Sequence, residues 1–145
     1  MRALLLAIAW WLAVPTASAE VWGREYFGNP VLTTETGAKK KFFDDLIKDK
    51  IVAINFIYTT CPDSCPLETA RLVRVADILG DRLGKDVFFY SITIDPKVDT
   101  PAILKGYKER FGARWSFLTG TQADIDGLRK KLGLYLPEIQ DGSNN

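Results

Sequence analysis

The chain has 145 residues, enough for one domain and not two, and its 19 basic residues nearly balance its 18 acidic ones. A net charge of +1 without a basic patch excludes the electrostatic footprint of a nucleic-acid-binding protein. The chain contains no histidine, which excludes Ser/His/Asp and Cys/His catalysis within it.

Residues 1–19 have the pattern of a secretory signal peptide. Arg2 precedes an unbroken apolar run over residues 3–14, and Ala17-Ser18-Ala19 provides a small-x-small cleavage pattern. This run is shorter than the about 20 apolar residues that span a bilayer, and an uncleaved membrane anchor is the alternative. We therefore expect an exported, periplasmic protein with a single domain over residues 20–145. Any contact with the inner membrane would be through an uncleaved amino terminus.

Apolar segments rich in β-branched and aromatic residues alternate with helical patterns along this domain. The sequence predicts strands over residues 31–34, 51–58, 87–94 and 115–118, and a helix after each of the last three. Residues 51–58 are almost entirely apolar, as in a central strand that is covered on both faces. Because a helix separates each of these later strands from the next, the strands should be parallel in an α/β fold.

Local signals mark the ends of the later helices. Thr100 with Pro101 predicts a helix start and Gly112 its end, and Thr121 predicts the start of the last helix. The large aromatic residues of the later strands are expected in the core: Phe88, Phe89, Trp115 and Phe117.

The two cysteines, Cys61 and Cys65, lie at the junction between strand 51–58 and the next helix. We expect Pro66 to open that helix and Cys65 to be its N-cap, because proline favours the first helical position. The positive end of the helix would then give Cys65 the lower thiol pKa of the two. One face of the helix is expected to be buried, with the apolar residues Leu72, Val75, Ala76 and Leu79.

Two thiolates close together suit Cu(I), and they equally suit reversible dithiol–disulfide exchange. A structural zinc site needs four cysteine or histidine ligands, more than this chain has. A purely structural disulfide is a third interpretation, although so short a loop would constrain the unfolded chain little. Glu68 is expected only to complement the helix dipole, and Asp95 to form a turn.

Motifs spread over residues 31–136 form a specific combination. TTCPDSCP follows a strand, and DPKVDTP begins at Asp95, further along the chain. The sequence WSFLTG then begins at Trp115. Together these motifs resemble the Sco/SenC family of thioredoxin-fold copper proteins, which assist assembly of the copper site of cytochrome c oxidase.

The resemblance implies a thioredoxin-like α/β fold with a mostly parallel central sheet and flanking helices. It also implies a copper site of two cysteines and one histidine, in which Cys61 and Cys65 match the cysteine ligands and serve as the redox pair. The histidine has no counterpart here, so Cu(I) is the expected ion, and Cu(II) would need a histidine beyond Asn145. In the family that histidine follows the region matched by residues 132–136. We therefore expect the domain to lack its C-terminal strands and helix in this chain.

The resemblance further implies a metallochaperone, with thiol–disulfide exchange as a possible second activity. Its partner would be the copper-site subunit of cytochrome c oxidase, or another copper or thiol protein. Two alternatives stay open from the residues themselves. One is a thiol–disulfide oxidoreductase without a metal role, and the other is an interaction module with a structural disulfide.

Overall fold

The computed structural model describes residues 23–62 and 64–134, which form three layers with a sheet between two sets of helices. The sheet has five strands in the order β2-β1-β5-β4-β3. These strands are β1 (Val31–Thr34), β2 (Lys39–Lys41), β3 (Ile51–Ile57), β4 (Val87–Thr93) and β5 (Ser116–Thr119). The helical segments are α1 (Arg24–Phe27), the π-helix η1 (Phe42–Ile47), α2 (Ser64–Leu79), the 3₁₀-helix η2 (Gly80–Arg82), α3 (Pro101–Phe111) and α4 (Gln122–Lys131).

The strands of the three β-α units are parallel, as predicted. β4 pairs with β3 on one side and with β5 on the other, and both pairings are parallel. The early hairpin adds β1 antiparallel to β5 and β2 antiparallel to β1. The fifth strand begins at Ser116, one residue later than predicted, because Trp115 precedes its first ladder pair with Tyr90.

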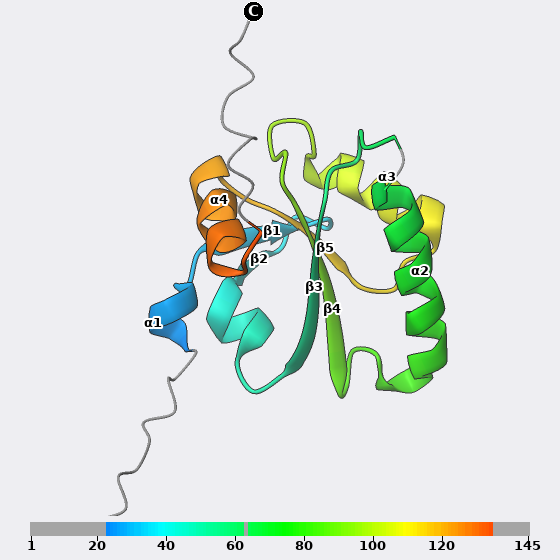
Figure 1. Cartoon of the computed structure of the whole chain (residues 1–145), viewed down its shortest axis with the longest axis horizontal. Helices are drawn as coiled ribbons and strands as arrows, with labels where there is room; N and C mark the ends of the chain where they lie inside the picture. The colour runs from blue at the N-terminus through cyan, green and yellow to red at the C-terminus, as the bar shows by residue number, and fades with distance from the viewer. Residues whose placement is uncertain (1–22, 63, 135–145) are drawn as a thin grey trace, which may run out of the picture.

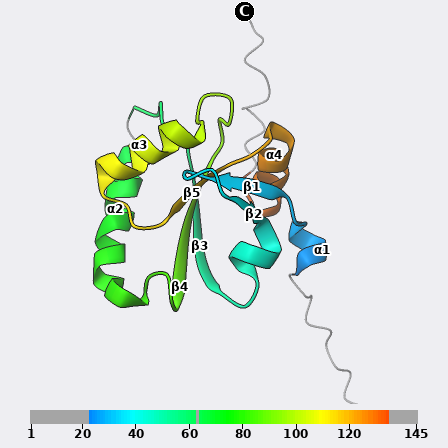
Figure 2. The same cartoon turned by 180° about the vertical axis from the view of Figure 1, so that it is seen from behind.

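Helices α2 and α3 cover one face of the sheet, and α4 with η1 covers the other (Figures 1 and 2). The alternation of side chains along β4 shows the two faces: Phe89 packs toward α2 and α3, whereas Tyr90 and Ile92 pack on the opposite side. Phe89, Trp115 and Phe117 are buried as predicted, and Phe88 is half-buried. None of the helices in the described part of the chain is long and apolar enough to cross a membrane.

The expectation of a central, fully covered β3 is wrong for the residues described. β3 lies at the edge of the sheet, and Ile57 is its only fully buried side chain. Ile51 is 66% exposed. The apolar run predicted burial on both faces, but no described strand pairs with its outer edge.

The predicted caps of α3 and α4 are confirmed. The Thr100 hydroxyl accepts a hydrogen bond from the N–H of Ile103, and Pro101 is the first helical residue. Gly112 ends α3 with a φ of +63°, in the left-handed region that glycine adopts without strain. The Thr121 hydroxyl accepts from the N–H of Asp124 in the same way. These caps fix where α3 begins and so place the loop that precedes it.

Candidate dithiol site

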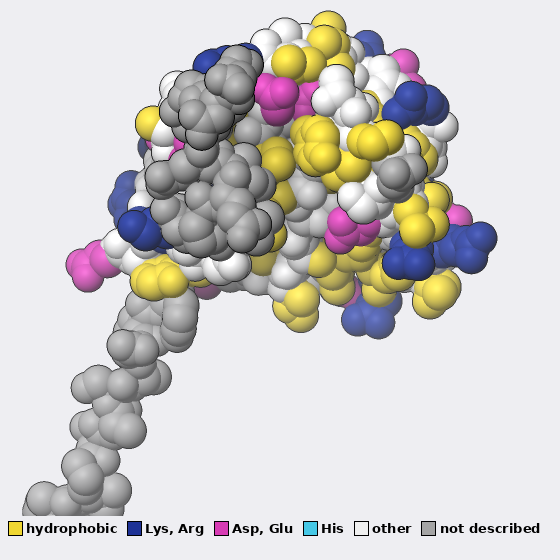
Figure 3. Space-filling model, turned by 45° about the horizontal axis from the view of Figure 1, so that its top comes forward, with side chains coloured by type: hydrophobic (Ala, Val, Ile, Leu, Met, Phe, Trp, Pro, Cys, Tyr) yellow, Lys and Arg dark blue, Asp and Glu magenta, His cyan; other side chains and the backbone are white. Residues whose placement is uncertain are grey.

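The two cysteines lie at the carboxyl end of β3, where the chain turns into α2. Both thiols are free and both side chains are buried, in the cluster between the sheet and the helices α2 and α3. Around this end of the molecule, hydrophobic side chains gather next to polar and charged ones (Figure 3). The structure thus brings together the two residues that the sequence identified as the candidate site.

Helix α2 begins at Ser64, so the predicted N-cap position of Cys65 is wrong. Cys65 is the second helical residue and Pro66 the third. Proline is tolerated there because the first four N–H groups of a helix have no partner within it. One of these groups, the N–H of Cys65, donates to Cys61 Sγ over 3.4 Å. Cys61 therefore interacts with the helix terminus in the way that was expected of Cys65.

The hydrogen bonds at Cys61 favour its thiolate. Its sulfur lies 3.4 Å from the Ser64 hydroxyl, and the N–H of Cys65 donates to it. These contacts, with the hydroxyl first, lower the pKa of Cys61 from its ordinary value of 9.0 to about 6. The Tyr58 hydroxyl also donates to Cys61, and this hydrogen bond raises the pKa of Tyr58.

Cys65 has the opposite shift, so the predicted order of the two thiol pKa values is wrong. Burial raises the pKa of Cys65, because it disfavours the charged form, and the N–H of Tyr58 opposes this effect only in part. The nearby Cys61 raises it further. The helix terminus stabilises a thiolate as predicted, but the sulfur that lies against it is Cys61.

One face of α2 packs over the dithiol, as predicted, but Val75 is not buried on it. Ala76 is buried, and Leu72 and Leu79 pack against the same cluster as the cysteines. Val75 is 43% exposed. Thr69 is fully buried instead, and its hydroxyl contacts the Tyr107 hydroxyl of α3 over 3.2 Å. Burial is the main cause that raises the pKa of Tyr107.

The loop after β4 contributes a buried acid, Asp99, which lies four residues after the predicted turn at Asp95. Asp95 does form a turn, since its carbonyl accepts from the N–H groups of Val98 and Asp99. Asp99, however, is fully buried, and its carboxylate accepts hydrogen bonds from Thr59 and Thr93. Thr59 lies 40 residues away in sequence. In the sequence, Asp99 could be recognised only as an acid inside the DPKVDTP motif. That motif did not indicate Thr59 as its partner.

Two depressions lie near the site. A hollow of about 220 Å³ is lined by Thr59, two residues before Cys61, and by α3 residues, namely Ile103, Gly106, Tyr107 and Arg110. A groove of about 490 Å³ follows the edge of β3 and includes Val52, Ile54 and Phe56. Glu68, which was expected only to complement the helix dipole, also lines this groove.

The donor set at the site fits a soft, two-coordinate ion. Two thiols from one loop can bind Cu(I), which prefers sulfur ligands. Within the described residues, no group of three or more His, Cys, Asp or Glu side chains is placed to hold a metal ion. The histidine of the resembled family cannot come from this sequence, which contains none. The residues present therefore fit Cu(I) better than they fit an ion that needs nitrogen ligands.

Comparison with known proteins assigns most of the chain to the family that its motifs resemble. The family model SCO1/SenC matches residues 28–144. A SCO2-like protein of Rickettsia felis is 34% identical over 68% of this chain and 47% of its own length. Protein SenC of Rhodobacter capsulatus is 33% identical over 83% of this chain and 51% of its own length. The chain thus spans about half the length of the curated relatives that it matches.

Solved structures confirm the thioredoxin-like α/β fold. ScoI of Bradyrhizobium japonicum with copper bound is similar at 31% identity and a TM-score of 0.67, over 80% of this chain and 73% of that one. A second similar structure, at 26% identity, is that of BsSco. BsSco is a member of the Sco family of cytochrome c oxidase assembly proteins and contains a disulfide switch. Its TM-score is 0.59, over 71% of this chain and 63% of that one.

One further solved relative bears on location. A SCO1/SenC family lipoprotein of Bacillus anthracis is similar at 28% identity and a TM-score of 0.61, over 71% of this chain and 62% of that one. A lipoprotein among the relatives is consistent with an exported protein. The expected signal peptide, residues 1–19, lies outside the described residues.

Proposed function

Since the chain belongs to the SCO1/SenC family, we propose that it binds Cu(I) through Cys61 and Cys65 and acts in the assembly of cytochrome c oxidase. There it would deliver copper to the oxidase copper site or keep the thiols of that site reduced. The observation that supports this most directly is the pair of free thiols at the start of α2, one of them with a pKa of about 6. The copper-bound structure of the similar protein ScoI supports copper binding by this chain.

The pKa values of the two thiols are shifted in opposite directions, and this supports an order in which the sulfurs would bind copper. Cys61 is a thiolate, because its pKa is about 6, whereas Cys65 is protonated. Cu(I) would first meet the Cys61 thiolate, and binding to both sulfurs would displace the proton of Cys65. Metal binding is therefore coupled to the release of one proton near pH 7. A target with two thiolates can then take the ion by exchanging its sulfurs for these two.

The thiol-maintaining role uses the same residues. The Cys61 thiolate attacks one sulfur of a target disulfide and forms a mixed disulfide, and the other target sulfur leaves as a thiolate. Cys65, once deprotonated, attacks Cys61 Sγ and releases the first target sulfur. The target gains two electrons and the Cys61–Cys65 pair becomes a disulfide. The low pKa of Cys61 supports this second function, and the disulfide switch of BsSco provides a parallel.

The compartment that suits this chemistry is the periplasm. A signal peptide over residues 1–19 would export the domain 20–145, or would retain it at the inner membrane if it is not cleaved. A domain that is active in an oxidising compartment must have its dithiol kept reduced before it can take up Cu(I).

Titration of the reduced protein with Cu(I) tests the assignment, with bathocuproine disulfonate as the competing chromophoric ligand. We expect one Cu(I) per chain, and the loss of most of that affinity in Cys61→Ser and in Cys65→Ser. Ser116→Ala is the control, because Ser116 lies in β5. Tight one-to-one binding in the double serine variant would refute the copper assignment. A disulfide potential above about −300 mV would distinguish a redox pair from a structural disulfide.

A further inference from the structure

Asp99 is a fully buried carboxylate at the junction of three segments. Its oxygens accept a hydrogen bond from the Thr59 N–H, at 3.3 Å to Oδ1 and 3.1 Å to Oδ2. The Thr59 hydroxyl donates to Oδ1, and the Thr93 hydroxyl donates to Oδ2. No lysine or arginine within the described part of the chain forms an ion pair with Asp99. The charge is thus held by uncharged donors alone.

These hydrogen bonds connect the dithiol segment to the rest of the sheet. Thr59 is the second residue after β3 and lies two residues before Cys61. Thr93 is the last residue of β4, the strand that pairs with β3. The carboxylate therefore ties the chain that leaves β3 to the end of the neighbouring strand. A buried polar group is costly unless it is hydrogen-bonded, and these contacts satisfy both carboxyl oxygens of Asp99.

The segment between Thr59 and α2 carries the contacts that define the thiol pair. The N–H of Cys61 donates to the Tyr58 carbonyl over 3.2 Å, and Cys61 Sγ accepts from the N–H of Cys65 over 3.4 Å. Helix α2 therefore fixes the thiol pair from the Cys65 side. On the Cys61 side, the hydrogen-bonded anchor nearest in sequence is the pairing of Thr59 with Asp99.

We propose that Asp99 is a positioning residue for the dithiol: by holding Thr59, it keeps Cys61 Sγ within reach of the Cys65 N–H and of the Ser64 hydroxyl. This stabilises the reduced, metal-free pair and shapes it for a two-coordinate ion. The copper part of the inference rests on the proposed function. The redox part rests only on the two cysteines.

Asp99→Asn tests the inference with little change of shape, and Glu35→Gln is its matched control. Glu35 is also a buried acid that accepts a backbone hydrogen bond, from Phe117, but its contacts are with β5 and α3. The disulfide potential is measured in dithiothreitol redox buffers, and Cu(I) affinity by competition with bathocuproine disulfonate. Circular dichroism confirms that each variant is folded.

In Asp99→Asn, we expect the dithiol–disulfide equilibrium to shift about tenfold toward the disulfide, which is a potential more negative by about 30 mV for this two-electron couple. The reason is that the reduced pair loses its ordered contacts. Cu(I) affinity should fall by about tenfold, within the range known for residues that orient metal ligands. Glu35→Gln should leave both quantities within about twofold of wild type, even though it also removes a buried charge.

Thr59→Val is the second variant, and it keeps the inference testable if Asp99→Asn does not fold. It retains the carboxylate, the β-branched shape and the backbone N–H, and removes only the hydroxyl donor. Its shifts should have the same sign and be smaller. The inference is overturned if the folded variants keep wild-type potential and copper affinity, or if Glu35→Gln changes them as much. Failure of the wild-type protein to bind Cu(I) would instead refute the proposed function, and the shift in potential would still decide the role of Asp99.

Discussion

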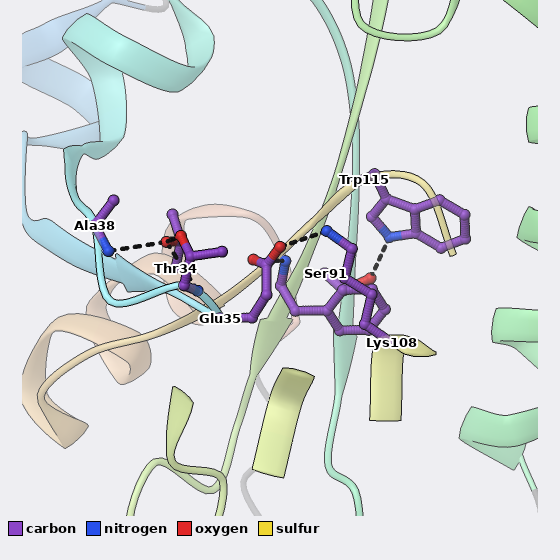
Figure 4. Close-up of polar contacts among 8 residues, drawn as sticks. Thr34, Glu35, Ala38, Ser91, Lys108 and Trp115 are labelled. Atoms are coloured by element: carbon purple, nitrogen blue, oxygen red, sulfur yellow. Dashed lines mark hydrogen bonds and ion pairs between the residues drawn. The ribbon is translucent and has the colours of Figure 1, made fainter. Parts of the chain in front are cut away.

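Two buried acids, Asp99 and Glu35, are stabilised in different ways in two regions of the molecule. At the dithiol end, the Asp99 carboxylate and the Cys61 thiolate both accept hydrogen bonds from hydroxyl and backbone N–H groups. At the turn after β1, Glu35 forms an ion pair with Lys108 of α3 and also accepts from the N–H of Phe117 (Figure 4). Glu35 is therefore paired with a cation, whereas Asp99 is held by uncharged hydrogen-bond donors alone.

The difference shows how an anion can be stabilised beside the proposed Cu(I) site. A lysine next to Cys61 would lower its thiol pKa, but its charge would also repel an incoming Cu(I). Hydrogen bonds from neutral donors favour the thiolate without that repulsion. Glu35 does not lie at a proposed metal site, so a positive charge beside it repels no incoming ion. Its ion pair with Lys108 connects α3 to the early hairpin.

The largest expected effect comes from breaking the ion pair in Lys108→Met. Glu35 is 5% exposed and Lys108 26%, so the variant leaves an almost buried carboxylate without its cation. We expect a loss of about 2–3 kcal/mol in the free energy of unfolding, less than for a fully buried pair because Lys108 reaches solvent. Urea denaturation followed by circular dichroism measures this loss.

Arg82→Met is the matched control for that measurement. Arg82 pairs with Asp86 on the surface, where an ion pair contributes about 0–1 kcal/mol. Equal losses in the two variants would contradict a stabilising role for the Glu35–Lys108 pair. The disulfide potential should be unchanged in both, since neither residue contacts the dithiol segment.

A smaller effect is expected from the isosteric substitution Thr93→Val. The Thr93 hydroxyl donates to Asp99 and accepts from the N–H of Asp95, and the loss of both hydrogen bonds should cost about 1–2 kcal/mol. Thr119→Val provides the comparison, because the Thr119 hydroxyl is buried without a partner among the described residues. That variant should be neutral or slightly more stable. A larger loss in Thr119→Val than in Thr93→Val would show that the hydrogen bond to Asp99 contributes little.

The last effect is expected on a pKa rather than on stability, because Ser64→Ala removes the hydroxyl contact that lowers the pKa of Cys61 most. The pKa of Cys61 should rise from about 6 toward its ordinary value of 9.0. Iodoacetamide alkylation of the single-cysteine variants Cys65→Ala and Cys61→Ala, followed against pH, measures the two thiols separately. Cys61 should react with a midpoint near pH 6, and Cys65 with a midpoint above 9. A Cys65 midpoint at or below that of Cys61 would refute the assignment of the thiolate.

The same shift predicts how the stability of the reduced protein depends on pH. Between about pH 6 and 9, Cys61 is deprotonated in the folded state and protonated in the unfolded state. The unfolded state then binds more protons, so Cys61 makes stability rise with pH over this window and the gain is lost as pH falls through 6. Cys65, with its raised pKa, opposes the trend only above pH 9. The rise should be absent in Cys61→Ser.

Much of the fold could be predicted because its signals are local. The alternation of apolar strands with helices gave the parallel order of β3, β4 and β5. The residues Thr100 and Pro101 placed the start of α3 correctly, since cap chemistry depends on neighbours within one turn. Two cysteines spaced four residues apart at a strand–helix junction identified the candidate site for the same reason.

Other features depended on tertiary contacts that no local pattern contains. Because α2 begins at Ser64, the N–H of Cys65 at the helix terminus donates to Cys61, and burial reversed the expected pKa order. The edge position of β3 depends on which strands pair with it, and its apolar run could not show that. Asp99 lies inside a motif that the sequence shows, yet only the folded chain brings it to Thr59 across 40 residues. The sequence by itself determined the thiols and the helix they precede, because these are set within a few residues. Only the tertiary structure decided which sulfur is the thiolate and which acid anchors it, because burial and long-range hydrogen bonds set both.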